Sequence, residues 1–371
     1  MEQNRTFLPN LNGLRFIGAL AVLVFHVFTL EREIWGDFTS SSTFQLISKV
    51  ASKGHHGVGL FFVLSGFLIT HLLLKEIKKS GSIQPFNFLM RRILRIWPLY
   101  FLIVIFGFFI FPHLPHGQET EHSLLNYSFF ISNFDEIWNG ANDSLNFLTV
   151  TWSISIEEQF YLCWILLLFL FPFFRKGKYL ASYFIAIVLS VILFRFFNHA
   201  NDRVMYYHTF ACASDLAIGG LCAIGVQRYS IQKFIVNLTK WQLVIIYLLG
   251  ISSILGSTVI FKGELHSIER LVHASFFAFV ILEQVYSQHS FWKADRIPGF
   301  FKGGEITYGI YMYHCVFIYY MRLLFIEFKL TDSPFLFVAY CILILLFTLG
   351  ISILSKRFFE NPFLRLKMKF Y

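Results

Sequence analysis

Charged residues are scarce in this chain of 371 residues. Asp, Glu, Lys and Arg make up only 14% of it, whereas 56% of the residues are hydrophobic. A soluble domain carries about a quarter charged residues, so the composition argues against a soluble enzyme. Cysteine is also rare, and all 5 cysteines lie inside apolar runs, which argues against a disulfide framework or a cysteine zinc site. No polar stretch is long enough for an appended globular domain.

Long apolar runs fill the chain instead. Each run has roughly 20 residues, enough for a helix to cross the ~30 Å hydrocarbon layer of a membrane. The expected spans are 12–30, 56–74, 88–111, 151–173, 180–197, 206–227, 241–260, 270–286, 305–326 and 334–355. The predicted fold is therefore all-α: a polytopic transmembrane bundle of about ten helices, with residues 1–371 forming a single membrane-embedded domain.

Basic residues mark one side of the predicted bundle. They concentrate in alternate gaps, at 75–79, 91–95, 175–178, 228–240 and 293–302, and after residue 355. The long gap 112–150 contains no Lys or Arg. By the positive-inside rule, both termini face the cytoplasm of a multi-pass cell (inner) membrane protein. The formal net charge of +9 thus reflects topology, and no nucleic-acid partner is expected.

Arg15 and His26 lie in the first predicted span, eleven residues apart. A helix returns to within about 20° of the same face over that interval and rises ~16 Å. Ionisable groups inside a membrane are functional candidates, and neutral histidine is the usual general base near neutral pH. The alternative is a histidine that bridges helices and an arginine in a structural ion pair. Gly18 and Ala19 lie near the same face and would let another helix approach closely.

Glu157 and Glu158 lie in the outer half of the fourth predicted span, at a depth similar to that of His26. A carboxylate can hold an imidazole in one tautomer and stabilise its cation. The sequence does not choose which glutamate would do so. Ser155 precedes Glu158 by three residues, which also has the form of a helix capping box.

Arg91, Arg92 and Arg95 stand at the cytoplasmic end of the third predicted span. Their forked guanidinium groups suit bidentate binding of phosphate. Plain anchoring at the positive side of the membrane is the alternative interpretation.

Other polar or small residues inside the predicted spans are candidates for the lining of a cavity. They are Ser65, Gly66, Asp215 and His314. Small residues such as Gly66 serve equally well for tight helix packing.

Two further features lie on the predicted outer side of the bundle. His55 and His56 precede the second predicted span, but the sequence offers no third or fourth ligand, so no metal site is predicted. The segment 112–150 carries carboxylates together with Tyr127 and Trp138, a composition that suits a sugar acceptor. It is long enough that we expect structure or function in it.

In their order along the chain, the motifs resemble the acyltransferase 3 family of integral-membrane O-acyltransferases. The resemblance covers Arg15 and His26, residues 57–69, residues 91–98, residues 152–161, residues 308–314 and residues 357–362. It implies transfer of an acyl group, usually acetyl, from cytoplasmic acetyl-CoA or another acyl-CoA to a hydroxyl of an extracytoplasmic glycan or lipid-linked sugar. No separate cofactor is expected.

Carried over residue by residue, the resemblance makes His26 the essential histidine and Arg15 its paired arginine. The arginines at 91, 92 and 95 would bind the CoA phosphates, and Glu157 and Glu158 form the acidic motif. The chain departs from the pattern at Gly59, where many relatives have aspartate, and at Cys315, where they often have tryptophan. Some relatives carry a C-terminal hydrolase-like domain, which is not expected here.

The resulting hypothesis makes His26, oriented by a glutamate, the base that activates the acceptor hydroxyl. Direct transfer and a covalent acyl-histidine intermediate both remain open, as does the identity of the glycan. The competing interpretation is a proton-coupled exporter of a small molecule, which buried Arg, His and Glu would also suit. A structural scaffold protein is a further alternative, but it leaves the buried charges unexplained.

Overall fold

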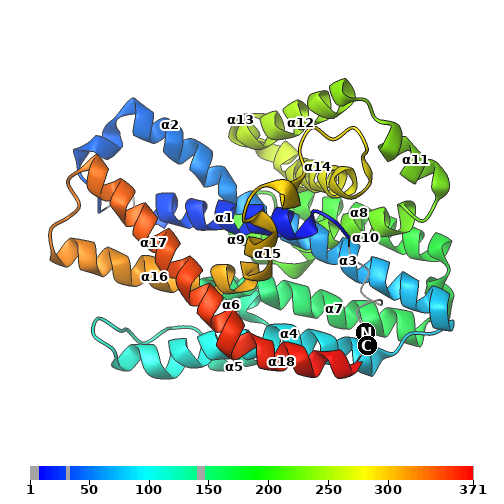
Figure 1. Ribbon diagram of the computed structural model, residues 1–371, viewed down its shortest axis with the longest axis horizontal. Helices are drawn as coiled ribbons and strands as arrows, with labels where there is room; N and C mark the ends of the chain where they lie inside the picture. Colours follow the sequence, from blue (N-terminus) through cyan, green and yellow to red (C-terminus); the bar gives the residue numbers. More distant parts are fainter. Residues whose placement is uncertain (1–7, 31–33, 140–146, 371) are drawn as a thin grey trace.

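The computed structural model describes residues 8–30, 34–139 and 147–370, and within these ranges all regular secondary structure is helical (Figure 1). The prediction of an all-α bundle is confirmed. In the described residues, nine helical segments are long and apolar enough to cross a membrane. A tenth candidate is a pair of helices that meet at 94°.

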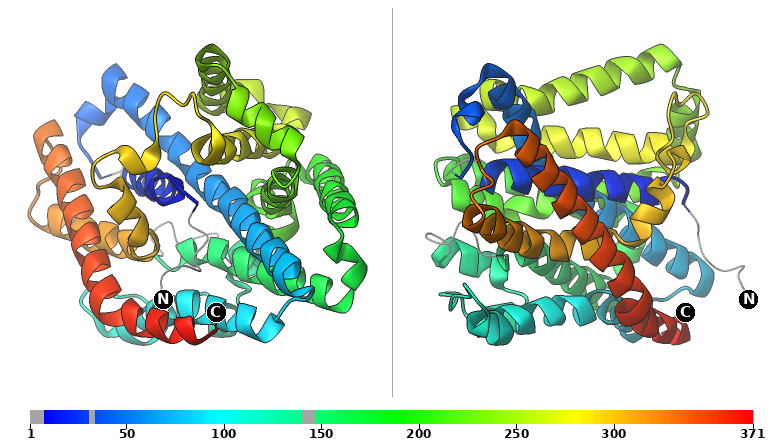
Figure 2. Two further views of the ribbon diagram at one scale, coloured as in Figure 1. Left: turned by 45° about the vertical axis from the view of Figure 1, so that its right-hand side comes forward. Right: turned by 60° about the vertical axis from the view of Figure 1, so that its left-hand side comes forward.

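Ten helices correspond to the predicted spans. They are α1 (Leu11–Leu30), α3 (His56–Ser80), α4 (Pro85–Ile105), α7 (Trp152–Leu170), α8 (Gly177–Asn198), α10 (Thr209–Gly225), α12 (Lys240–Leu255), α14 (His266–Tyr286), α16 (Thr307–Glu327) and α17 (Pro334–Leu354). The shorter helices connect or flank them: α2 (Ser42–Ala51), α5 (Leu124–Ser128), α6 (Ser132–Trp138), α9 (Asp202–Tyr207), α11 (Tyr229–Asn237), α13 (Ser257–Ile260), α15 (Phe300–Glu305) and α18 (Asn361–Lys367). The oblique helix α17 runs across α16 in Figure 1 and again in the right-hand view of Figure 2.

Helix α3 lies at the centre of the bundle and packs against α1, α10 and α14. Its contact with α10 is unusually close because glycines face each other. A Cβ added at Gly66 would overlap the Leu216 carbonyl oxygen, and one added at Gly219 would overlap the Val63 carbonyl oxygen. Backbone-to-backbone packing of this kind is how membrane helices associate without a hydrophobic driving force between them.

Helix α1 packs against α3, α15 and α16. The predicted close approach at Gly18 is confirmed, since a Cβ added at Gly57 of α3 would lie 2.6 Å from the Gly18 carbonyl oxygen. The two glycines thus hold α1 against the start of α3. This contact fixes the height and rotation of the helix that carries Arg15 and His26.

The directions of α3, α10 and α14 limit how many times the chain crosses the bundle. Gly59 lies beside both Asp215 and Phe277, and further along α3 Val63 lies beside Gly219. Since the His56 and His273 rings also meet, with centroids 4.4 Å apart, α10 and α14 both run parallel to α3. The chain must therefore cross back between the end of α10 and the start of α14. Helix α12, about 24 Å long at 1.5 Å per residue, can make that crossing together with α13, which gives up to ten crossings in the described residues.

The glycine contact between α3 and α10 generates a test. We expect Gly66→Ala to lower the melting temperature of the purified protein, because the new methyl group must displace the α10 backbone, at a cost of about 1–3 kcal/mol. Gly350→Ala is the control, since nothing lies within 4 Å of its added Cβ. Equal melting temperatures for the two variants would show that the contact does not hold the bundle together.

Candidate functional site

A cluster of charged side chains occupies the end of the bundle where α1 and α4 begin. Arg15 of α1 donates to Asn12 Oδ1 at 3.0 Å, and the charges of Arg92, Arg95 and Glu157 act on it. The Arg92 guanidinium carbon lies 5.3 Å from the centre of the Tyr161 ring, a cation–π contact. The structure thus brings together three of the four predicted arginines with one predicted glutamate.

Arg91 points elsewhere. It donates to the Phe370 carbonyl at 2.6 Å and lies 3.4 Å from Glu76, which joins the start of α4 to the end of α3 and to the C-terminal segment. Arg91 therefore occupies the mouth of the bundle, outside the cluster around Arg15.

The two glutamates have different partners. Glu157 accepts hydrogen bonds from Ser65 of α3 and from Tyr161, both at 2.7 Å. Glu158 accepts from Trp97 Nε1 at 3.0 Å, and its other oxygen is buried without a hydrogen-bond partner among the described residues. The capping-box interpretation of Glu158 is wrong: α7 already begins at Trp152, three residues before Ser155.

His26 lies at the other end of α1, against α16. Its Nδ1 is 3.0 Å from the Val22 carbonyl oxygen and 3.0 Å from Nε2 of His314. His314 in turn places its Nδ1 3.1 Å from the Ile310 carbonyl oxygen, and Cys315 Sγ lies 3.3 Å from His314 Nε2. Sequence reasoning placed His314 only among the candidates for a cavity lining.

These contacts assign the tautomers. A carbonyl oxygen only accepts, so the ring nitrogen beside it must carry the proton. Nδ1 of His314 therefore donates to Ile310, which leaves its Nε2 as an acceptor for Nδ1–H of His26. Since Nδ1 of His26 also faces the Val22 carbonyl, the remaining nitrogen, Nε2, carries the lone pair. A neutral imidazole with a free Nε2 lone pair is the form that a general base needs.

The expected pairing of His26 with a glutamate is therefore wrong in this structure. Both glutamates are bound to other side chains, and the neutral ring of His314 takes the place proposed for a carboxylate. The reason is depth: Glu157 of α7 faces α3 and the arginines, at the opposite end of α1 from His26, so the predicted similar depth of His26 and the glutamates is wrong in this structure. Spacing within one span does not give the level at which that span meets its neighbours.

Helix α16 connects the two ends of the site. Tyr308 donates to the Ile96 carbonyl at 2.8 Å, next to the arginines of α4, and Tyr311 lies 2.6 Å from Ser153 Oγ of α7. The Tyr311 ring is in turn 5.9 Å from that of His314. A row of hydroxyl-bearing side chains thus runs from the arginine cluster to the histidine pair.

The other residues predicted to line a cavity lie in different parts of the bundle. Ser65 belongs to the site through Glu157, whereas Gly66 is a packing residue against α10. Asp215 forms a 2.8 Å ion pair with Arg270. Its Oδ2 also lies 3.4 Å from the position of a Cβ at Gly59. A carboxylate from α10 thus occupies the space beside the position where the resemblance leads one to expect an aspartate.

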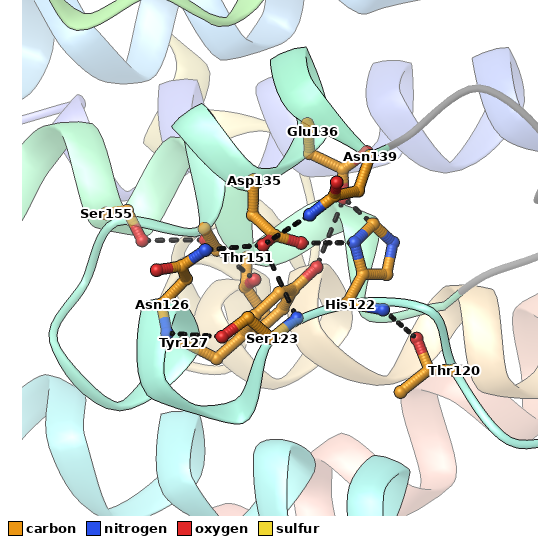
Figure 3. A network of polar contacts seen from close by, with 11 residues as sticks. Thr120, His122, Ser123, Asn126, Tyr127, Asp135, Glu136, Asn139, Thr151 and Ser155 are labelled. Atoms are coloured by element: carbon orange, nitrogen blue, oxygen red, sulfur yellow. Dashed lines mark hydrogen bonds and ion pairs between the residues drawn. The ribbon is translucent and has the colours of Figure 1, made fainter.

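The described part of segment 112–150 contains a buried polar network (Figure 3). Asp135 of α6, which is fully buried, contacts His122 at 2.5 Å and accepts from Asn126 at 2.6 Å. Burial by itself raises the pKa of Asp135, but the hydrogen bonds from His122 and Asn126 outweigh it and leave that pKa below its usual 3.8. Burial raises the pKa of the neighbouring Glu136, which accepts from Tyr127 at 3.1 Å.

This network corrects one expectation and confirms another. Asp135, Glu136 and Tyr127 are buried, so they do not contribute to the acidic and aromatic surface proposed for a sugar acceptor, whereas Glu119, Glu121 and Trp138 are exposed. The expectation of structure in the segment is confirmed by α5 and α6. Hydrogen bonds from Thr151 and Ser155 to Ser132 tie α6 to the start of α7, and so to the site.

The geometry describes a polytopic membrane protein with arginine, glutamate and histidine side chains between α1, α4, α7 and α16. The sequence matches the acyltransferase 3 family, whose shared unit is described as an acyltransferase domain, over residues 8–354. The chain belongs to this family of integral-membrane acyltransferases.

Named relatives agree with this assignment. The O-acetyltransferase OatA of Staphylococcus aureus (strain NCTC 8325 / PS 47) is 25% identical over 372 residues. The putative O-acetyltransferase SACOL0978 of Staphylococcus aureus (strain COL) is 24% identical over 375 residues. Each alignment covers 96% of this chain but only 57% of the relative, so the chain spans little more than half the length of these proteins. No solved structure matches the chain.

The buried network around Asp135 generates a second test. We expect Asp135→Asn to destabilise the protein by about 3–5 kcal/mol, because it removes the buried carboxylate that contacts His122 and accepts from Asn126. Since the pKa of Asp135 is lowered in the folded state, its contribution is present above the usual carboxyl range and is lost as the pH falls through the folded value. Thermal unfolding at neutral pH, with the exposed Glu119→Gln as control, measures the effect.

Proposed function

We propose that this acyltransferase transfers an acyl group, with acetyl the leading candidate, from cytoplasmic acyl-CoA to a hydroxyl of an extracytoplasmic carbohydrate such as a surface polysaccharide. The observation that carries the proposal is the arrangement along α1. Arginines suited to phosphate lie at the end predicted to be cytoplasmic, and a histidine with a free Nε2 lone pair lies ~16 Å away at the outer end.

The donor would bind at the arginine cluster. Guanidinium groups recognise phosphate by paired hydrogen bonds, and the charges of Arg92 and Arg95 act on Glu157 until the phosphates of CoA arrive. The pantetheine arm would then extend along the hydroxyl-bearing face of α16. The unpartnered oxygen of Glu158 is available to accept a hydrogen bond from an amide of that arm.

The transfer step would take place at His26. The acceptor hydroxyl gives its proton to Nε2 as its oxygen attacks the thioester carbonyl, and the carbon–sulfur bond breaks as the tetrahedral intermediate collapses. The proton then passes from the imidazolium to the departing thiolate, so atoms and charge balance. While His26 is a cation, its Nδ1–H is stabilised by the Val22 carbonyl and by Nε2 of His314.

The roles of the two histidines can be separated. We expect His26→Ala to lower kcat by about 10²–10⁴, because it removes the general base. His314→Ala should lower kcat by about tenfold without changing KM for acyl-CoA. His314→Gln should recover part of the loss, since its carbonyl can accept from His26. The measurement is transfer of labelled acetyl from acetyl-CoA to surface glycan in membranes with matched amounts of each variant. Full activity of His26→Ala would exclude this mechanism.

The arginines provide a matched pair for the donor site. We expect Arg92→Gln to raise KM for acyl-CoA about tenfold or more, because a half-buried charged contact to phosphate is lost. Arg91→Gln should leave that KM nearly unchanged, since Arg91 binds Glu76 and the chain end. If both substitutions raise KM equally, the phosphates lie at the mouth of the bundle and not at the cluster around Arg15.

The exporter remains the second candidate function because its requirement for buried ionisable groups is also met. It differs in the product that it yields. An exporter moves a molecule without modifying it, so vesicles would accumulate label with no ester-linked acetyl on glycan. Base-labile acetyl on the glycan without net transport of a small molecule supports the acyltransferase.

A further inference from the structure

A second cluster of ionisable side chains lies where α3 and α14 begin. It joins His56, the first residue of α3, to Glu269 and His273 of α14. Glu269 and His273 are four residues apart and so share one face of their helix. The atoms of these three residues that could bind a metal all lie within 4.8 Å of one another.

The buried imidazoles of this cluster lack hydrogen-bond partners. The side chain of His273 is only 3% exposed, and neither of its ring nitrogens has a hydrogen-bond partner among the described residues. The same is true of Nε2 of His56. The Ser253 carbonyl lies near the His273 ring without normal hydrogen-bond geometry, and Glu269 Oε1 is 4.0 Å from Nδ1. An unsatisfied buried polar atom costs about 1–3 kcal/mol, so three of them side by side indicate a missing ligand.

Two imidazoles and one carboxylate are a donor set that zinc prefers. We propose that His56, Glu269 and His273 bind a divalent transition-metal ion, with Zn²⁺ the best match, and that this ion clamps the start of α3 to the start of α14. Bond lengths of ~2.0–2.1 Å in a tetrahedral site place the ligand atoms about 3.3 Å apart. Small side-chain rotations bring the three ligands from their present separation to that distance.

Cations lie close to the cluster. Arg270, next to Glu269 in sequence, forms a 2.8 Å ion pair with Asp215. Lys53 donates to the Ser257 hydroxyl at 2.8 Å, and its ammonium charge also acts on Glu269. His266 lies 3.3 Å from the second oxygen of Glu269, where it can orient the carboxylate as outer partners of metal ligands do. Glu269 is the carboxylate of the cluster and would offset part of the charge of the ion.

The site would also support the outer end of α1. The His55 ring packs on that of His56 with centroids 4.0 Å apart, and it packs on Phe25 at 5.5 Å. An ion that fixes His56 therefore also fixes the side chains beside His26. The proposal rests on the cluster itself and holds whether or not the chain transfers acyl groups.

The test is metal binding by the purified full chain. The protein is purified with a tag that contains no histidine, and bound metal is removed with a chelator. It is then titrated with Zn²⁺ in the presence of a fluorescent chelator that competes for the ion. In a separate titration with Co²⁺, visible absorption reports how the ion is coordinated. We expect about one ion per chain and a higher melting temperature with Zn²⁺ than without it. His56→Ala, Glu269→Gln and His273→Ala should each weaken binding about 100-fold or more, since removing a ligand costs at least as much as removing an outer partner.

The control substitutions match the residue types. His289→Ala and Glu264→Gln change exposed residues and should leave binding intact. If His273→Ala does not fold, His56→Ala and the isosteric Glu269→Gln still test whether the cluster binds the ion. Absence of stoichiometric binding to the unmodified chain would overturn the proposal. Loss of binding in His314→Gln, but not in His56→Ala, would also overturn it, because the ion would then sit between His26, His314 and Cys315.

Discussion

The structure depends on one constraint: inside a hydrocarbon layer every ionisable side chain needs a partner. An unpaired charge at that depth costs at least about 2.5–3.5 kcal/mol. The described residues meet this cost by pairing across helices. Asp215 of α10 binds Arg270 of α14, and Glu157 of α7 lies among the arginines of α1 and α4. Arg195 of α8, which is almost fully buried, donates to backbone carbonyls of Met205 and Ser267.

Helix α3 is where most of these pairs meet. His56, Gly59 and Ser65 lie along it at intervals of about 5 and 9 Å, and each touches a different polar group. His56 faces His273, Gly59 leaves room for Asp215, and Ser65 donates to Glu157. The same helix needs Gly57 and Gly66 to admit the backbones of α1 and α10. Small residues on α3 therefore serve polar pairing as well as packing, because only close backbones bring short side chains within hydrogen-bond distance.

The sequence predicts the fold well because apolar length is a local property. Each predicted span has its helix, and the close approach at Gly18 is found where the pattern places it. Even α12, the least regular span, is required by the parallel directions of α3, α10 and α14. Sidedness stays a prediction, since no membrane is part of the structure. The buried state of Asp135 could not be foreseen, because a polar segment with two carboxylates looks like surface until α6 is packed against α7.

The site was only partly predictable, because contacts between helices are not a local property of the sequence. The pattern indicates that Arg15, His26 and Glu157 lie inside the bundle, but pairing depends on the level and rotation of each helix against its neighbours, which no spacing within one helix reveals. His314 lies in an aromatic motif on α16, and only the packing of α1 against α16 makes it a partner of His26. Glu269 and His273 did carry a signal, their four-residue spacing, but they lie more than two hundred residues from His56.

His26 has His314 as its partner in place of the expected glutamate, and this has a physical consequence. A glutamate beside His26 would favour the imidazolium at rest, and a histidine already protonated cannot accept a proton from a hydroxyl. The Val22 carbonyl and the His314 ring offer only dipoles, which orient Nδ1–H without drawing a charge into the membrane. His26 is thus held neutral between turnovers, with its lone pair on Nε2, and the cation forms only while the acceptor proton is in transit. The carboxylates are kept at the far end of α1, where the permanent charges of the arginines balance them.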